Sequence, residues 1–423
     1  YDEDFDDIFS IQTSIAQEIA GSLKSQISES EKLNIEDKLT DSIEAYELYI
    51  RVKESRKTRL SRHQHYKLRK KLLGEIIEID SGFAEAYALI SLEYSEGVHY
   101  GRSNPQSKKE KSKMFIDKAF KIKPESPDVR FAYGYYYYGC LKDYLRAIEH
   151  YQYALTKEPG NAEYNQYIGF AHRRLGNADE TLKYLEKAYI LDPNDTGLLH
   201  ELNGTYLFYK RYDKINLIKT DKVHYRIAPN DGYLYATRAE LTFWFEGNTA
   251  NARKIIEEST ILIPDFDFYE SILWKLDIFD ENYDNYLDYV INKKDSLSFN
   301  QRLILPKQAE MALGYWLLED DVKQKRASQK ALDMMINLQE FQGDPRYHLV
   351  LGFIYAMLGN NEDAIKETKM AMALSPASKD AMLASIFKGG LAEVYTVIGE
   401  HDMALNMIEN FLTESSSYNW NLI

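Results

Sequence analysis

The sequence predicts an all-α protein, an α-α superhelix of about nine to ten helix-turn-helix repeats. Two observations predict this class: prolines recur at a nearly constant interval, and glycine-centred turns recur between stretches whose apolar residues have helical spacing. Only 10 Pro and 21 Gly occur in 423 residues, which is few for an all-β protein rich in turns. Because this length exceeds what one compact core usually supports, we expect an extended array or several domains.

Five prolines mark the repeat. Their spacings are 35, 34, 36 and 35 residues, and each proline follows an apolar, helix-like stretch. Proline ends a helix because it lacks the backbone N–H and restricts the residue before it. The five are Pro124, Pro159, Pro193, Pro229 and Pro264.

The segment 345–378 shows the repeat best. Gly352 and Ala364 are small enough to let two helices approach closely, and Gly359 with Asn360 supplies a turn that needs a positive φ. Pro376 closes the segment. The same marks recur in the segments 128–161, 162–195, 233–266 and 385–418.

This pattern resembles the tetratricopeptide (TPR) consensus over most of 44–418: an aromatic residue, Leu-Gly, Tyr, a turn, Ala, an aromatic residue, Ala and Pro. The resemblance implies a TPR solenoid over 41–423. Gly134 stands one place early against the consensus, and the segments 267–300 and 306–341, within 267–341, are degenerate. Residues 95–112 insert extra length inside one repeat.

Residues 1–40 are expected to form an N-terminal helix and a linker, the tail of an upstream domain. Apolar residues at helical spacing predict a helix over 6–27, and 28–40 are polar. The run DIFSIQTSIAQEIAGSL followed by EAYELYIRVKE resembles bacterial chains in which a TPR region follows a TolB-like segment. There the upstream part is a nucleotidyl cyclase, a winged-helix DNA-binding domain or a kinase. Because the chain begins with Tyr1 rather than Met, we expect such a part here.

The TPR resemblance also implies a concave groove for a protein or peptide ligand. Family contacts fall on the second, fifth, ninth and twelfth repeat positions, where this sequence supplies rings and a few charged groups. The alternative is that the rings only fill a tightly wound superhelix. The family's carboxylate clamp of Lys, Asn and Arg is missing. The candidate groove residues are Tyr136, Phe170, Arg173, Phe208, Trp244, Trp316, Arg346 and Phe353, with polar neighbours Gln166, Glu201, Thr237 and Glu393.

Two patterns resemble metal sites, and neither predicts one. The start DEDFDD has the opening carboxylate spacing of a Ca²⁺ loop, but Asp7 and Thr13 stand where that loop needs Gly and Glu. His63 and His65 lie in a basic stretch with no third ligand nearby, which favours an exposed helix face. We therefore expect no metal and no other cofactor.

Catalytic signatures are also missing. Residues 319–321 are acidic, but they stand where a helix ends and a turn begins. No P-loop, G-x-S-x-G or G-x-G-x-x-G motif occurs, and the run GYYYYG at 134–139 matches no phosphate cradle. Cys140 is the one cysteine and is expected to be a small buried residue. The sequence therefore predicts no enzyme.

The net charge of −14 disfavours nucleic-acid binding by this chain. Basic clusters at 56–62, 67–71 and 108–113 are expected to be solvated faces, with an acidic or phosphate-bearing partner as the alternative. No apolar run approaches the roughly 20 residues that a membrane span needs. The sequence leaves the compartment of the protein open: the cytoplasm is slightly favoured, and the periplasm is the alternative.

These observations favour a binding scaffold, the regulatory or sensory part of a larger bacterial protein. Two alternatives stay open. One is the regulatory region of a nucleotidyl cyclase whose catalytic domain lies upstream, and the other is a self-assembly module that forms homo-oligomers through apolar repeat ends.

Overall fold

The computed structural model describes residues 38–55, 62–100, 105–215, 231–260, 268–300 and 302–413, together with Glu18 and Pro229. The predicted helix over 6–27 lies outside the described residues. The described part holds nineteen α-helices and two short strands, and 79% of the described residues are helical. The all-α prediction is confirmed, apart from one small hairpin.

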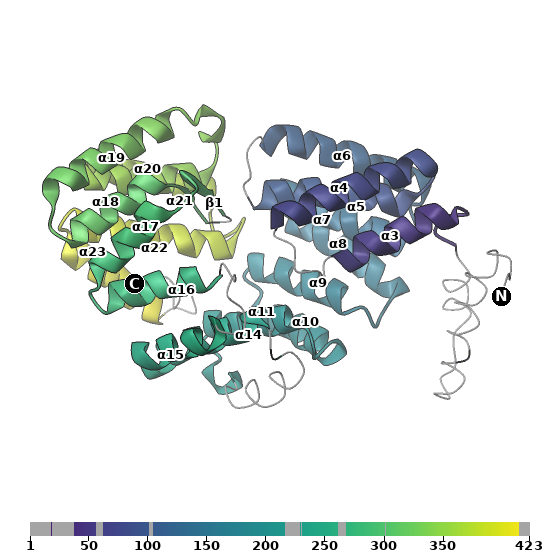
Figure 1. Ribbon diagram of the computed structural model, residues 1–423, viewed down its shortest axis with the longest axis horizontal. Helices are drawn as coiled ribbons and strands as arrows, with labels where there is room; N and C mark the ends of the chain where they lie inside the picture. Colours follow the sequence, from purple (N-terminus) through teal and green to yellow (C-terminus); the bar gives the residue numbers. More distant parts are fainter. Residues whose placement is uncertain are drawn as a thin grey trace. The chain divides into compact units, whose positions relative to one another are not determined.

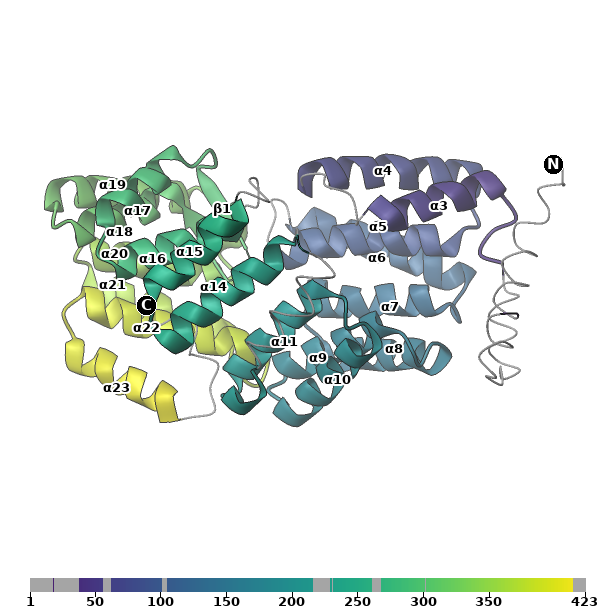
Figure 2. The same ribbon diagram turned by 60° about the horizontal axis from the view of Figure 1, so that its bottom comes forward.

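The chain forms two compact units, Tyr1–Tyr164 and Asn165–Ile423. Figures 1 and 2 show antiparallel helices within each unit. In the first unit, the described elements are α3 (Ile43–Ser55), α4 (Arg62–Ile79), α5 (Ala84–His99), α6 (Pro105–Ile122), α7 (Pro127–Tyr135), the π-helix η1 (Tyr136–Leu141) and α8 (Tyr144–Lys157).

The second unit continues with α9, which crosses the boundary between the units. Its described elements are α9 (Ala162–Arg174), α10 (Ala178–Leu191), α11 (Thr196–Phe208), the 3-10 helix η2 (Tyr212–Lys214), α14 (Gly232–Glu246), α15 (Thr249–Thr260), α16 (Phe268–Phe279), α17 (Tyr283–Asn292), β1 (Leu297–Phe299), β2 (Ile304–Pro306), α18 (Lys307–Leu317), α19 (Asp321–Ile336), the 3-10 helix η4 (Gln339–Phe341), α20 (Pro345–Met357), α21 (Asn361–Leu374), α22 (Ala381–Val397) and α23 (His401–Thr413).

Consecutive helices pack as pairs, from α3 with α4 to α22 with α23. Nine such pairs lie in the described residues, and α11 follows the fourth pair in the place of a first helix, in agreement with the predicted nine to ten repeats. We call the two members of a pair its first and second helix. Aspartates cap several of these helices, because a side-chain oxygen satisfies a free N–H of the first turn. Examples are Asp143, Asp195, Asp320, Asp344 and Asp380.

The turn between the helices of a pair needs a left-handed residue. The four glycines predicted there have φ between 60° and 83°. They are Gly176, Gly247, Gly359 and Gly399. Four non-glycine residues, Lys142, Lys210, Glu281 and Glu319, occupy the same region at φ 55° to 57°. These turns therefore keep the repeat geometry without its glycine. At Glu281 and Glu319 this helps to explain why the segments 267–300 and 306–341 look degenerate in the sequence.

The helices of a pair cross closely at a glycine in the first helix. A Cβ on Gly352 would come within 2.9 Å of the Ala364 carbonyl oxygen, and one on Gly169 within 2.8 Å of the Leu185 side chain. At Gly134 it would meet the ring of Tyr151 at 2.5 Å. A side chain at these crossings would push the second helix outward, so the predicted role of small residues is confirmed.

The early position of Gly134 has a structural cause in η1. Counted from the N-cap Ser126, Gly134 occupies the same place as Gly352 counted from its own cap, Asp344. The extra residue comes later, where the helix widens into η1 before the cap of α8. A π-helical turn accommodates one inserted residue without breaking the helix.

The weakly repetitive region around residue 300 contains a β-hairpin that the sequence analysis did not predict. β1 pairs antiparallel with β2, with Leu297 opposite Pro306. Side chains of the hairpin pack against a core that includes Phe341 and Tyr347. Three-residue strands carry too little alternation to be read from a sequence.

Two contacts join the beginning of the second unit to its end. Arg174 at the end of α9 pairs with Asp380 at 3.2 Å, and both side chains are buried. The ammonium of Lys210, after α11, donates to the carbonyl oxygen of Phe411 on α23 at 3.0 Å. Repeats more than two hundred residues apart are therefore in direct contact.

Candidate partner-binding surface

All eight predicted groove residues lie on the first helices of their pairs or on the π-helix that extends one. Tyr136, on η1, belongs to the first unit, and the other seven belong to the second. The surface considered below therefore consists of the seven residues of the second unit.

Burial divides the aromatic candidates. Trp316 on α18 is 37% exposed, whereas Phe208 on α11 is buried. Phe170, Trp244 and Phe353 are half-buried. Tyr136 is also buried within its own unit. Trp316 is therefore the ring with the most area available to a ligand, and the burial of Phe208 and Tyr136 favours a packing role for these two.

Arg173 connects two neighbouring repeats. Its guanidinium donates two hydrogen bonds of 3.0 Å to one carboxylate oxygen of Glu201 on α11 and a third, of 2.9 Å, to the Thr205 hydroxyl. It also lies 4.8 Å from the centre of the Phe170 ring. Because Arg173 is buried, these contacts fix its position, and Glu201 is the member of the pair that reaches solvent, with a side chain 42% exposed.

Arg346 has a structural role that its position in the repeat did not reveal. Its guanidinium donates hydrogen bonds of 2.9 and 2.5 Å to the two carboxylate oxygens of Asp344, the N-cap of its own helix. A third hydrogen bond, of 2.6 Å, goes to the carbonyl oxygen of Asn300 in the β1–β2 turn. Arg346 is 7% exposed, so it ties the hairpin to α20.

Two glutamates of this surface, Glu201 and Glu393, are in contact with solvent although nearby protein atoms desolvate their carboxyl groups in part. Desolvation by these atoms acts to raise the pKa of Glu201, but the Arg173 guanidinium outweighs it and leaves that pKa below its usual value. For Glu393 on α22, desolvation raises the pKa of the carboxyl to about 7. Its side chain is nevertheless exposed to solvent.

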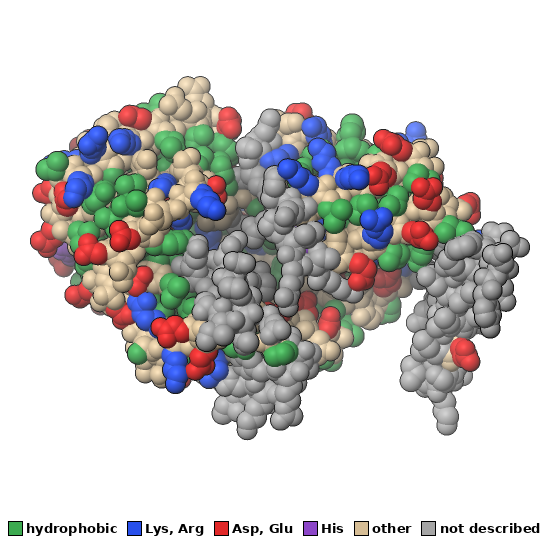
Figure 3. Space-filling view, in the orientation of Figure 1, with side chains coloured by type: hydrophobic (Ala, Val, Ile, Leu, Met, Phe, Trp, Pro, Cys, Tyr) green, Lys and Arg blue, Asp and Glu red, His purple; other side chains and the backbone are tan. Residues whose placement is uncertain are grey.

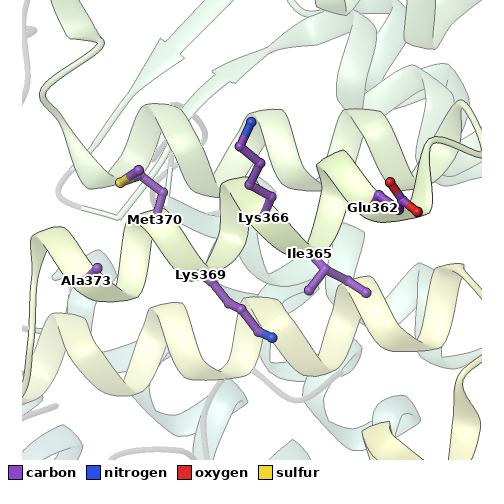
Figure 4. A pocket seen from close by; sticks show the side chains of 6 residues that line it. All are labelled: Glu362, Ile365, Lys366, Lys369, Met370 and Ala373. Carbon is purple, nitrogen blue, oxygen red and sulfur yellow. The ribbon is translucent and has the colours of Figure 1, made fainter.

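A shallow hollow of about 620 Å³ lies over α21, a second helix. Figure 4 shows that Lys366 and Lys369 diverge from the face of α21 that lines this hollow. None of the eight predicted groove residues lines it. Its lining consists of Glu362, Ile365, Lys366, Lys369, Met370 and Ala373.

Reactive groups outside this surface are explained by packing. Cys140 is buried on η1, where its thiol contacts the Ser95 hydroxyl at 3.4 Å, and burial raises the pKa of the thiol. The acidic run at 319–321 forms a turn, with Glu319 left-handed and Asp320 capping α19, as expected.

Among the residues that the structure describes, no group of three or more His, Cys, Asp and Glu side chains is arranged to hold a metal ion. None of the described helices combines the length and hydropathy needed to cross a bilayer. The side chain of His63, for which an exposed helix face was expected, lies outside the described residues.

Comparison with known proteins gives structural neighbours only. No protein-family model and no curated protein matches the chain. Similar solved structures include PilW, described as a widely conserved type IV pilus biogenesis factor, at 15% identity and TM-score 0.41, covering 55% of this chain and all of PilW. Others are pilF of Pseudomonas aeruginosa, at 17% identity and TM-score 0.34, covering 62% and 97%, and yeast Tom70, at 12% identity and TM-score 0.41, covering 96% and 91%.

The repeat assignment rests on the chain's own structure. Its helices are paired in sequence order, its predicted turn glycines have positive φ, and its first helices cross their partners at glycine. These are the features that the repeat period predicted. The chain therefore has an all-α fold built of successive helix pairs, the fold that the tetratricopeptide resemblance implies.

Proposed function

We propose that this chain is a scaffold that binds a protein or peptide through the first helices of its second unit, centred on Trp316. A single observation carries the proposal: a tryptophan on a first helix is 37% exposed, although burying such a ring is strongly favourable. Aromatic rings of this kind dominate the binding energy of protein interfaces. Phe170, Trp244 and Phe353, which are half-buried on other first helices, extend the candidate surface.

The charged groups of this surface suggest the polarity of the ligand. Arg173 and Arg346 already hold carboxylates of the chain itself, so neither is available as a clamp for an acidic ligand end. Glu201 and Glu393 are the charged groups that reach solvent. We therefore propose that this surface binds an apolar segment with nearby basic or hydrogen-bond-donating groups.

Site-specific crosslinking tests the surface. A photoreactive phenylalanine analogue replaces Trp316, and the same analogue replaces Ile190, which is 76% exposed on α10, a second helix. We expect a discrete crosslinked partner at 316 and none at 190. The partner's crosslinked peptide is then synthesised, and Trp316→Ala should weaken its binding by at least about tenfold, the loss of a small hot spot of roughly 1.4 kcal/mol.

Two results would contradict the proposal. One is equal crosslinking at both positions. The other is a Trp316→Ala variant that binds the peptide normally but melts at a lower temperature, because the ring would then serve packing alone.

The larger context is a further proposal. The resemblance of residues 7–23 and 44–54 to TolB-linked bacterial chains supports a regulatory region attached to an output domain, a nucleotidyl cyclase being one candidate. The sequence of the gene upstream of Tyr1 tests this directly.

One observation favours self-assembly as a second function. On α23, the last described helix, Met403 is 48% exposed and Leu405 is 57% exposed. Apolar ends of repeat arrays stack when no polar cap covers them. Light scattering of the wild-type chain and of Leu405→Glu over a range of concentrations separates monomer from oligomer.

A further inference from the structure

Positive charge is concentrated on two second helices of the first unit. Together α4 and α6 carry eleven Lys and Arg against four Asp and Glu, an excess of seven positive charges. Because the whole chain has a net charge of −14, the remaining residues carry a net charge of −21. Among the other described second helices, α19 has the largest excess, with two positive charges.

The basic halves of α4 and α6 both flank the C-terminal half of α5. Arg69 of α4 pairs with Glu93 of α5 at 2.5 Å. The next residue of α5, Tyr94, lies under the ammonium of Lys111 of α6, which is 5.6 Å from the ring centre. The two clusters, more than thirty residues apart in sequence, are therefore neighbours in space, and Figure 3 shows Lys and Arg side chains gathered over α4 and α6.

Lys113 of this region pairs with Asp117 of its own helix, but five other lysines have no close ion pair with any residue that the structure describes. Among the described residues, none forms an ion pair with Lys67, Lys70 or Lys109. Lys71 approaches Glu75 only at 3.6 Å, in a pair so exposed that it contributes little. Four of the five lysines are exposed and Lys109 is half-buried. We call the set the basic face: Lys67, Lys70, Lys71, Lys109 and Lys111.

The basic face coincides with extra helix length. α4 and α6 have 18 residues each, whereas the other described second helices have 10 to 16. In both, the added length lies at the N-terminal half, where the lysines are. The insertion predicted at 95–112 thus lengthens α5 and α6 beside an equally long α4. The second helices of two successive repeats, α4 and α6, are therefore both lengthened and basic at their N-terminal ends.

We propose that the basic face docks a short acidic segment of a protein partner. This inference rests on the proposed scaffold function and adds a second contact, in the first unit. Each basic half of about ten residues is about 15 Å long, a length that about five residues of an extended peptide would span. Lysine ammonium groups bind as point charges without fixed geometry, which suits a run of Asp or Glu side chains in variable register.

The size and surroundings of the basic face favour a peptide over larger polyanions. The basic face is confined to two helices, and the rest of the chain is strongly acidic. A nucleic acid or an anionic membrane would extend beyond about 15 Å and meet that acidic remainder within a few Debye lengths, each about 8 Å at physiological salt. A short acidic peptide would avoid this repulsion.

Fluorescence anisotropy with labelled peptides tests the proposal. The probe is a peptide of about eight glutamates between Gly-Ser flanks, and its control replaces every Glu by Gln. We expect the intact chain to bind the Glu peptide, to bind the Gln peptide at least about tenfold more weakly, and to lose affinity between about 50 mM and about 300 mM salt.

Charge reversal then locates the site. Lys67→Glu, Lys70→Glu and Lys71→Glu combined should weaken binding at least about tenfold, because three exposed charge contacts become repulsive. Lys109→Glu with Lys111→Glu should weaken it in the same direction. The matched control is Lys325→Glu with Lys330→Glu on α19, which are also exposed, and it should change affinity less than about twofold. Thermal melting verifies that each variant is folded.

Several results would overturn the inference. They are no binding of the Glu peptide, an equal loss in the α19 control, and tighter binding of single-stranded oligothymidine or of phosphatidylserine-phosphatidylcholine vesicles than of the peptide. Trp316→Ala should leave the Glu peptide affinity unchanged. Failure of this test and failure of the proposed groove are therefore distinguishable.

Discussion

The buried pair between Arg174 and Asp380 gives the most demanding prediction. Both side chains are almost fully buried, at 3% and 2% exposed, and their closest N–O distance is 3.2 Å. Arg174→Met keeps most of the apolar stem but leaves the Asp380 carboxylate without this cation. Removing one partner of a buried ion pair costs about 3–5 kcal/mol. For a unit of this size, that corresponds to a melting temperature roughly 10 °C lower.

Asp380 has a second role that must be separated from the pair. Its other carboxylate oxygen accepts the backbone N–H of Leu383 at 3.0 Å and so caps α22. Asp380→Asn keeps this cap and removes the charge, whereas Asp380→Ala loses both and should cost about 1 kcal/mol more. The double variant Arg174→Met with Asp380→Asn should recover most of the loss, because no unpaired charge stays buried.

Circular dichroism melting and hydrogen exchange read out these variants. In Arg174→Met, amides of both α9 and α22 should exchange faster, although they are separated by about two hundred residues. The control is Lys183→Met, whose exposed pair with Glu180 should leave the melting temperature nearly unchanged. A Arg174→Met chain that melts like the control, or one in which only α9 exchanges faster, would refute a direct coupling of the two ends.

Three further predictions concern the packing of the pairs. Gly134→Ala should lower the free energy of unfolding by about 1–3 kcal/mol, because the new Cβ would meet the Tyr151 ring. Gly74→Ala, where a Cβ would have nothing within 4 Å, should raise it by about 1 kcal/mol. Chemical denaturation measures both changes. Burial, aided by the nearby charge of Arg130, lowers the pKa of His150 to about 4, below its value in the unfolded chain. The unfolded chain therefore binds a proton first, so the free energy of unfolding should fall as the pH drops from about 6.5 to 4. In thermal melts, His150→Phe should make that decline shallower. Glu319→Gly should stabilise the α18–α19 turn by about 1 kcal/mol in the same melts, since the left-handed backbone no longer carries a side chain; unchanged stability would contradict strain there.

The repeat itself was predictable because its signals are local. A proline that ends a helix and a glycine that adopts positive φ act through their own backbone, so Pro376 and Gly359 reveal their roles without knowledge of the fold. The close crossing at Gly352 follows from the same period. Local rules failed where another residue took the turn position, as Lys142 and Glu319 do.

The candidate site was less predictable because its contacts are distant in sequence. Repeat position placed Arg173 and Arg346 on first helices correctly. It gave no sign that Glu201 and Asn300 would engage them, since those partners lie 28 and 46 residues away. Exposure of Trp316 likewise depends on how neighbouring repeats pack. The period predicts which helix a residue occupies, and only the packing determines whether its side chain remains available.

The contact between Arg174 and Asp380 also bears on how the chain is made. Most helices bind a neighbour in sequence, so each pair can fold soon after it leaves the ribosome, with little loop-closure entropy to overcome. Asp380 is synthesised about two hundred residues after Arg174, so during that interval the end of α9 carries a cation whose final partner does not yet exist. Nascent chains arrested before residue 380 should therefore leave the C-terminal end of α9 more open to chaperones and proteases, and the last part of the protection of α9 should arrive only when α22 docks.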